Sequence, residues 1–287
     1  MADVVASASL IPLLDLDPDL GDGIERADWE AARRDCKGHV VRVAHGGWQL
    51  TPGTTGRFGP IGLVIAEGVL CREIAIRDRH MLELLGSGDV LQPPVSDARL
   101  GGPVMLTAVT DLTLVALGKA FISAAARWPV LLANVHRRLE AQRARLAVQG
   151  LVGHLPRAEH RVLFVLGHLA DRWGKVVPDG VLLPLPLTHD VLGQLSAARR
   201  STVTIAVNML ESEGLIRRPD DGSWLLTPEA ARALDAIAQP KRTRHVLGET
   251  LVVRQQLTEA RSTRAASRGA ADLHPASTSA ASINSAR

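Results

Sequence analysis

Apolar residues between positions 36 and 117 fall into short runs of the kind that forms β-strands. Turn signals containing glycine and proline separate these runs. Many short strands at this spacing predict a sandwich, barrel or jelly roll. In the first 35 residues the pattern instead predicts one or two amphipathic helical pieces, most clearly at residues 28–32. The expected strands are residues 40–43, 63–65, 73–76, 104–109 and 112–117.

Residues 119–149 follow the period of one long helix with a single seam. The repeat is 3.5 residues, as in a coiled coil, and Pro129 near its start can kink the helix. One helix with one apolar seam needs a partner, and we expect a second copy of the chain to supply it. The alternative is that the seam packs only against the chain's own β domain. The seam comprises Trp128, Leu132, Val135, Leu139, Gln142, Leu146 and Gln149, and the residues expected at the dimer contact are Leu132, Val135, Leu139, Gln142 and Leu146.

The pattern from residue 157 onward predicts a winged helix-turn-helix. A support helix over 157–173 is followed by a strand-like segment at 182–185 and a short helix that begins after Thr188. Small residues at 196–198 connect it to a second helix over 199–213, whose apolar residues recur at the i, i+3, i+4, i+7 spacing. Gly214 then ends the helix, a hairpin turns at 219–222, and Thr227-Pro228 opens a last helix.

The second helix of this unit has the chemistry of a recognition helix. Its start is basic and its outer face is polar, which suits the major groove of double-stranded DNA. Two arginines in the first strand of the hairpin suit phosphate contacts from a wing. We expect the DNA contacts to come from Thr188, Ala198, Arg199, Arg200, Ser201, Thr202, Thr204, Ile205, Asn208, Arg217 and Arg218.

Composition limits the other possibilities. The 287 residues suffice for two domains, and the net charge is only +3, so local charge placement decides the partner. Two distant cysteines, Cys36 and Cys71, provide neither a disulfide framework nor an iron–sulfur site.

There is no long apolar run and no basic leader at the N-terminus, so we expect a cytoplasmic protein without a membrane contact. Catalytic motifs such as Gly-x-Ser-x-Gly are missing, and no enzyme activity is expected.

With these features the sequence resembles the Crp/Fnr family, named for the cyclic-AMP receptor protein and the fumarate–nitrate reduction regulator. The resemblance covers roughly residues 40–234 and is strongest over 187–195, 200–203 and 209–216. It implies an α+β fold with an N-terminal β-roll (a jelly roll like that of cyclic-nucleotide-binding domains), a long dimerisation helix and a C-terminal winged helix-turn-helix. It also implies a homodimer that binds double-stranded DNA and contacts RNA polymerase. The expected divisions are a β-roll domain at 1–118, the helix at 119–150, the DNA-binding domain at 151–239 and a disordered basic tail at 240–287.

The chain departs from the family pattern at two places. Family recognition helices commonly present an arginine, then an acidic residue, then a second arginine one turn later. Arg200 matches the first, but Ser201 and Ile205 stand at the other two positions, so we expect a different operator sequence. In the β-roll, residues 90–94 (Val-Leu-Gln-Pro-Pro) replace the Gly-Glu-Leu segment that holds the ribose, and Gly102-Pro103 replaces the arginine pair that holds the cyclic phosphate.

A buried phosphate without a cation is costly, so cyclic AMP is disfavoured. No cofactor and no metal site are expected. Any effector is unknown: the β-roll either senses one or only supports the dimer. Haem stays an alternative because His39, His45 and His80 lie in or near the β domain. A second class of function is a sensor module for haem or another small molecule whose helical end contacts protein rather than DNA. The basic start of the second helix favours DNA.

Overall fold

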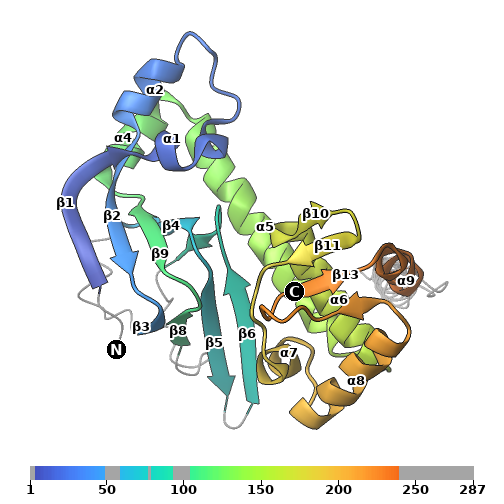
Figure 1. Ribbon diagram of the computed structural model, residues 1–287. Helices are drawn as coiled ribbons and strands as arrows, with labels where there is room; N and C mark the ends of the chain where they lie inside the picture. The colour runs from blue at the N-terminus through green and yellow to red at the C-terminus, as the bar shows by residue number, and fades with distance from the viewer. Residues whose placement is uncertain (1–3, 49–58, 77–78, 93–103, 239–287) are drawn as a thin grey trace, which may run out of the picture. The chain divides into compact units, whose positions relative to one another are not determined.

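Two antiparallel sheets form the N-terminal β-roll of the computed structural model, which describes residues 4–48, 59–76, 79–92 and 104–238 (Figure 1). The first sheet has the order β1-β2-β9-β4-β7 and the second the order β3-β8-β5-β6. The strands are β1 (Val4–Pro12), β2 (Lys37–Val43), β3 (Gly46–Trp48), β4 (Leu63–Glu67), β5 (Leu70–Ile76), β6 (Arg79–Leu85), β7 (Val90–Leu91), β8 (Val104–Ala108) and β9 (Leu112–Ala116).

The five-stranded sheet is buried on both faces because its strands alternate two sets of apolar side chains. Leu63, Ile65 and Leu114 belong to a core shared with residues of the second sheet. Their neighbours Val64 and Val115 belong to a separate core with helical residues. The side-chain period of two in a strand produces this division.

The N-terminal segment differs from the helical expectation. Residues 4–12 form β1, which pairs antiparallel with β2 from Val4 opposite Val43 to Pro12 opposite Lys37. Pairing with a strand that lies further along the chain supplies backbone hydrogen bonds that the local pattern does not reveal. The helical expectation holds further on, in α1 (Leu13–Leu16), the 3₁₀ helix η1 (Pro18–Gly21) and α2 (Trp29–Asp35).

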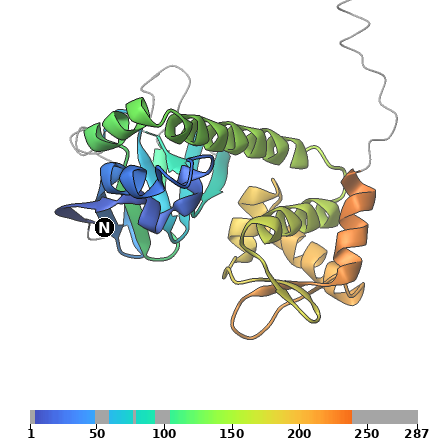
Figure 2. The same ribbon diagram turned by 90° about the horizontal axis from the view of Figure 1, so that it is seen from above.

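The expected long helix is two helices, α4 (Lys119–Arg127) and α5 (Val130–Val152). Trp128 between them has the non-helical angles φ −121° and ψ 83°. Because the ring of Pro129 disfavours helical angles in the residue before it, the chain breaks here rather than kinking. Figure 2 shows α5 as one continuous helix that leads from the β-roll to the C-terminal domain.

The C-terminal domain has the predicted order of helices around a small four-stranded sheet. Its sheet order is β10-β11-β13-β12, and β10 was not expected from the sequence. None of the described helices is both long enough and apolar enough to cross a membrane. The elements are α6 (Ala158–Trp173), β10 (Lys175–Val177), β11 (Gly180–Leu183), α7 (His189–Leu195), α8 (Arg200–Ser212), β12 (Ile216–Arg217), β13 (Trp224–Leu226) and α9 (Pro228–Ala238).

One apolar core holds this domain together and extends to the β-roll. Val162 and Leu166 of α6 pack with Val203 of α8 in this core. Leu82 and Leu84 of β6 belong to the same cluster. This shared core therefore fixes the orientation of α7 and α8 within the domain.

The tail expected at residues 240–287 lies outside the described residues.

Candidate DNA-binding surface

The connection between α7 and α8 is a tight turn fixed by the backbone. Thr188 caps α7, and its Oγ1 accepts a hydrogen bond from the Val191 amide at 3.3 Å. At the other end, the Ala198 amide donates to the Gly193 carbonyl at 2.8 Å. A Cβ atom at Gly193 would lie 2.7 Å from the Ala198 oxygen, so this approach requires glycine. Ala197 has a φ of +50°, in the left-handed region.

The face of α8 that packs on the domain and the face that meets solvent are distinct. Val203, Ala206, Val207 and Leu210 are buried, as their spacing predicts. The opposite stripe is exposed and consists of Ser201, Ile205, Asn208, Met209 and Ser212. A helix held from one side in this way can enter a groove with the other.

Two arginines lie at the N-terminal end of this exposed stripe. Arg199 is the N-cap residue of α8 and Arg200 its first residue, and both are exposed. An Arg200 Nη1 atom lies 3.7 Å from a carboxylate oxygen of Asp190, and both side chains are more than half exposed. Such an ion pair is weak in water. The guanidinium group can therefore exchange this carboxylate for a phosphate or a base edge.

The wing carries the second basic pair. Arg217 in β12 and Arg218 directly after it are exposed. The Arg218 guanidinium carbon lies 5.1 Å from the centre of the Trp224 ring, which is completely buried. A cation held over an aromatic face has a preferred position without losing its charge. The wing therefore presents a fixed positive charge.

Sequence reasoning missed His189, which links the two helices of the motif. Its Nδ1 lies 2.9 Å from Thr204 Oγ1, and that hydroxyl also donates to the Arg200 carbonyl at 3.1 Å. Because the hydroxyl has one proton and the carbonyl can only accept, the Nδ1 of His189 is the donor in this contact. Burial, with Arg218 and Arg200 nearby, lowers the pKa of His189, so its neutral form is favoured.

The remaining predicted contacts are less accessible than the arginines. Ala198 and Thr202 are half-buried, and the Thr204 hydroxyl is engaged by His189 and Arg200. Thr188 is exposed, but its hydroxyl caps α7. The predicted contact residues that the structure leaves exposed, apart from Thr188, are therefore Arg199, Arg200, Ser201, Ile205, Asn208, Arg217 and Arg218.

Residues 160–233 match the family model of the Crp-like helix-turn-helix domain. This region is a Crp-like helix-turn-helix domain. Solved structures with a similar fold cover most of the chain, including the β-roll. FixK2 from Bradyrhizobium japonicum is 14% identical with a TM-score of 0.54, and the alignment covers 70% of this chain and 97% of that one. A CooA mutant from Carboxydothermus hydrogenoformans is 16% identical with a TM-score of 0.53, covering 82% and 98%.

A CRP/FNR-family transcriptional regulator from Thermus thermophilus is 20% identical with a TM-score of 0.50, covering 70% of this chain and 99% of that one. No curated protein matches the sequence. The chain has the Crp/Fnr fold, which confirms the predicted α+β class. The Crp-like domain and this fold together support a DNA-binding transcription regulator.

Outside the Crp-like domain, α5 divides the predicted seam between two faces. Val135 is 1% exposed within the core of the β-roll, and Gln142 exchanges two hydrogen bonds with the backbone of Val90, at 3.0 and 3.2 Å. These two residues face their own chain, which corrects the expectation that they contact a partner. Leu132 is 50% exposed, while Leu139 and Leu146 are half-buried. Pairing through these three stays a prediction.

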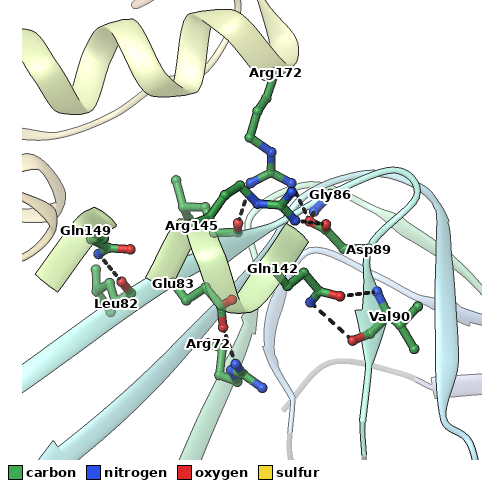
Figure 3. A network of polar contacts seen from close by, with 11 residues as sticks. Arg72, Leu82, Glu83, Gly86, Asp89, Val90, Gln142, Arg145, Gln149 and Arg172 are labelled. Atoms are coloured by element: carbon green, nitrogen blue, oxygen red, sulfur yellow. Dashed lines mark hydrogen bonds and ion pairs between the residues drawn. The ribbon is translucent and has the colours of Figure 1, made fainter. Parts of the chain in front are cut away.

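A buried acidic residue joins the β-roll to the Crp-like domain. Figure 3 shows Arg145 of α5 and Arg172 of α6 converging on Asp89, and each makes an ion pair with it. Asp89 also accepts a hydrogen bond from the Gly86 amide at 2.9 Å, and Arg172 donates to the Leu84 carbonyl at 2.9 Å. The loop before β7 is therefore tied to two helices by charge.

The β-roll offers no histidine cluster for haem among the described residues. His39 and His45 are exposed, and His80 contacts Glu73 through its Nδ1 atom. No group of three or more metal-ligating side chains occurs in the part of the chain that the structure describes. The Gly102-Pro103 segment, which is expected at the cyclic phosphate, lies outside the described residues.

Proposed function

We propose that this protein is a homodimeric, sequence-specific transcription regulator that places α8 of each subunit in the major groove of double-stranded DNA. The observation that carries the proposal is the pair of exposed arginines at the start of α8, a helix whose opposite face is buried. Arginine can bond bidentately to guanine, and a helix N-terminus attracts phosphate. Arg217 and Arg218 on the wing would contact the backbone beside it.

The test is DNA affinity after removal of the two recognition-helix arginines. We expect Arg199→Ala with Arg200→Ala to weaken binding to a selected operator by about 1–3 kcal/mol for each arginine that reads a base. The matched control is Arg26→Ala with Arg34→Ala, which removes the same charge from exposed positions of the β-roll. Equal affinity and equal salt dependence of the two double variants would reject α8 as the recognition helix.

The proposed dimer uses three leucines of α5 that the chain's own fold does not fully bury, although Leu139 also packs against the β-roll core. Leu132, Leu139 and Leu146 are spaced by seven residues, so they lie along one seam of the helix. Two such subunits would present their recognition helices to half-sites about 34 Å apart, one turn of the duplex.

We expect Leu132→Glu to give a monomer in sedimentation experiments and to weaken operator binding. The control variant Val176→Glu changes another exposed apolar residue, in β10, and should leave the dimer intact. A wild-type chain that stays monomeric at micromolar concentration in the presence of DNA would contradict the dimer.

Control by cyclic AMP is not part of the proposed function. The residues at the expected phosphate site are Gly102 and Pro103, which carry no positive charge. A cyclic phosphate buried there would lack the cation that offsets its desolvation. Calorimetry with cyclic AMP and cyclic GMP should show no saturable heat, and micromolar affinity for either would overturn this part of the proposal.

A further inference from the structure

Two large apolar side chains stand on the face of α8 that meets solvent. Ile205 is 70% exposed and Met209 is 40% exposed, one helical turn apart. The helix's other apolar residues, including Val203 and Val207, are at most 3% exposed. Packing within the chain therefore does not explain an isoleucine at position 205. A ligand that covers α8 would cover Ile205.

The neighbours of Ile205 place it where a base edge would lie. Ser201 precedes it by one turn and Asn208 follows it by three residues, and both are exposed on the same stripe. Arg200 begins the helix five residues earlier. If α8 lies in the major groove, the polar residues Ser201 and Asn208 and the apolar Met209 lie beside Ile205 on the DNA-facing stripe. Ile205 itself can neither donate nor accept a hydrogen bond.

The major groove presents one apolar group, the C5-methyl of thymine. An isoleucine against a guanine or a cytosine edge would cover a polar group without satisfying it, which is unfavourable. Against a thymine, the isoleucine side chain and the C5-methyl group remove each other's apolar surface from water. We propose that Ile205 contacts the C5-methyl group of a thymine in each half-site and thereby helps to set the operator sequence. This inference rests on the proposed function and names a feature of its DNA ligand.

The expected effect follows from the area of a single methyl group. Burial of one such group contributes about 0.8 kcal/mol, which corresponds to about a fourfold change in affinity. A dimer with one such contact in each of two half-sites would bind about fifteenfold more weakly when both methyl groups are removed. Both changes are within the range of a fluorescence-anisotropy titration.

The experiment first selects bound sequences from a random duplex library with the wild-type chain. Each thymine of the selected half-site is then replaced in turn by deoxyuridine, which removes only the C5-methyl group. We expect one position per half-site at which this replacement weakens wild-type binding about fourfold. Ile205→Ala should bind thymine and deoxyuridine there equally. Val176→Ala shortens another exposed apolar side chain, outside α8, and should keep the full difference.

Three outcomes separate this inference from the function on which it rests. A wild-type chain that selects no sequence from the library would overturn the proposed function and this inference together. A chain that binds its operator but discriminates deoxyuridine at no position would overturn the inference alone. A discrimination that persists in Ile205→Ala would assign the methyl contact to another residue. Because Ile205 is 70% exposed, Ile205→Ala should unfold at the wild-type temperature, and Ile205→Val should give an intermediate discrimination.

Discussion

Asp89 offers the most direct test of how the β-roll and the Crp-like domain are held together. The residue is only 4% exposed, and its carboxylate meets the guanidinium groups of Arg145 and Arg172. Asp89→Asn keeps the shape of the side chain and removes its charge. The two arginines, whose side chains are 26% and 16% exposed, would then face each other without the carboxylate that pairs with both.

The size of the effect can be worked out from these contacts. Removal of one partner from a buried ion pair typically costs about 3–5 kcal/mol. Here the cost should be smaller, because both arginines keep some water and Arg172 retains its bond to the Leu84 carbonyl. The asparagine oxygen can also still accept from the Gly86 amide. We therefore expect Asp89→Asn to lower the free energy of unfolding by about 2–3 kcal/mol.

Urea unfolding followed by circular dichroism and tryptophan fluorescence measures this loss. The control is Asp15→Asn, the same chemical change in an ion pair with Arg33 whose two side chains are 38% and 41% exposed. An exposed pair contributes little, so the control should unfold close to wild type. Equal losses in the two variants, or no loss in Asp89→Asn, would refute the argument that burial gives the Asp89 contacts their strength.

Three further predictions follow from single side chains. Ala197→Gly should raise the free energy of unfolding by up to about 1 kcal/mol, because glycine adopts the left-handed φ at that turn without strain; a loss in thermal melts would contradict this. Burial and then Arg172 lower the pKa of His168, so the unfolded chain binds the proton more readily. Stability should fall as the pH drops through the ordinary histidine range near 6.5, and His168→Gln should reduce that slope in urea titrations. Burial raises the pKa of Cys36 to about 12 and that of Cys71 to about 11, so iodoacetamide near neutral pH should modify both slowly in the folded chain and rapidly in urea.

The helix-turn-helix could be predicted from the sequence because its signals are local. Thr188 caps α7 as expected, and Gly214 after α8 has a φ of +69°, which glycine adopts readily. The four apolar positions of α8 are all buried. Each of these signals acts within one or two helical turns. The bounds of α6, α7 and α8 therefore differ from the expected ones by no more than a residue or so.

The contact between His189 and Thr204 could not be predicted in the same way. The two residues lie in different helices, and the angle between those helices decides whether the side chains meet. A histidine directly after a helix cap is compatible with many roles, and the sequence held no signal for this one. The same applies to Asp89, whose partners Arg145 and Arg172 lie 56 and 83 residues away.

The sequence by itself determined the elements whose period and end signals lie within a short stretch of chain, above all α8 with its arginine-bearing start. The tertiary structure decided what each apolar face packs against. The 3.5-residue repeat of α5 marks a seam, but only the folded chain shows that Val135 and Gln142 face the β-roll while Leu132 is left exposed. The same holds for β1, whose strand pairing depends on a partner segment. Periodicity fixes which side of an element is buried, whereas the covering surface depends on contacts between distant parts of the chain.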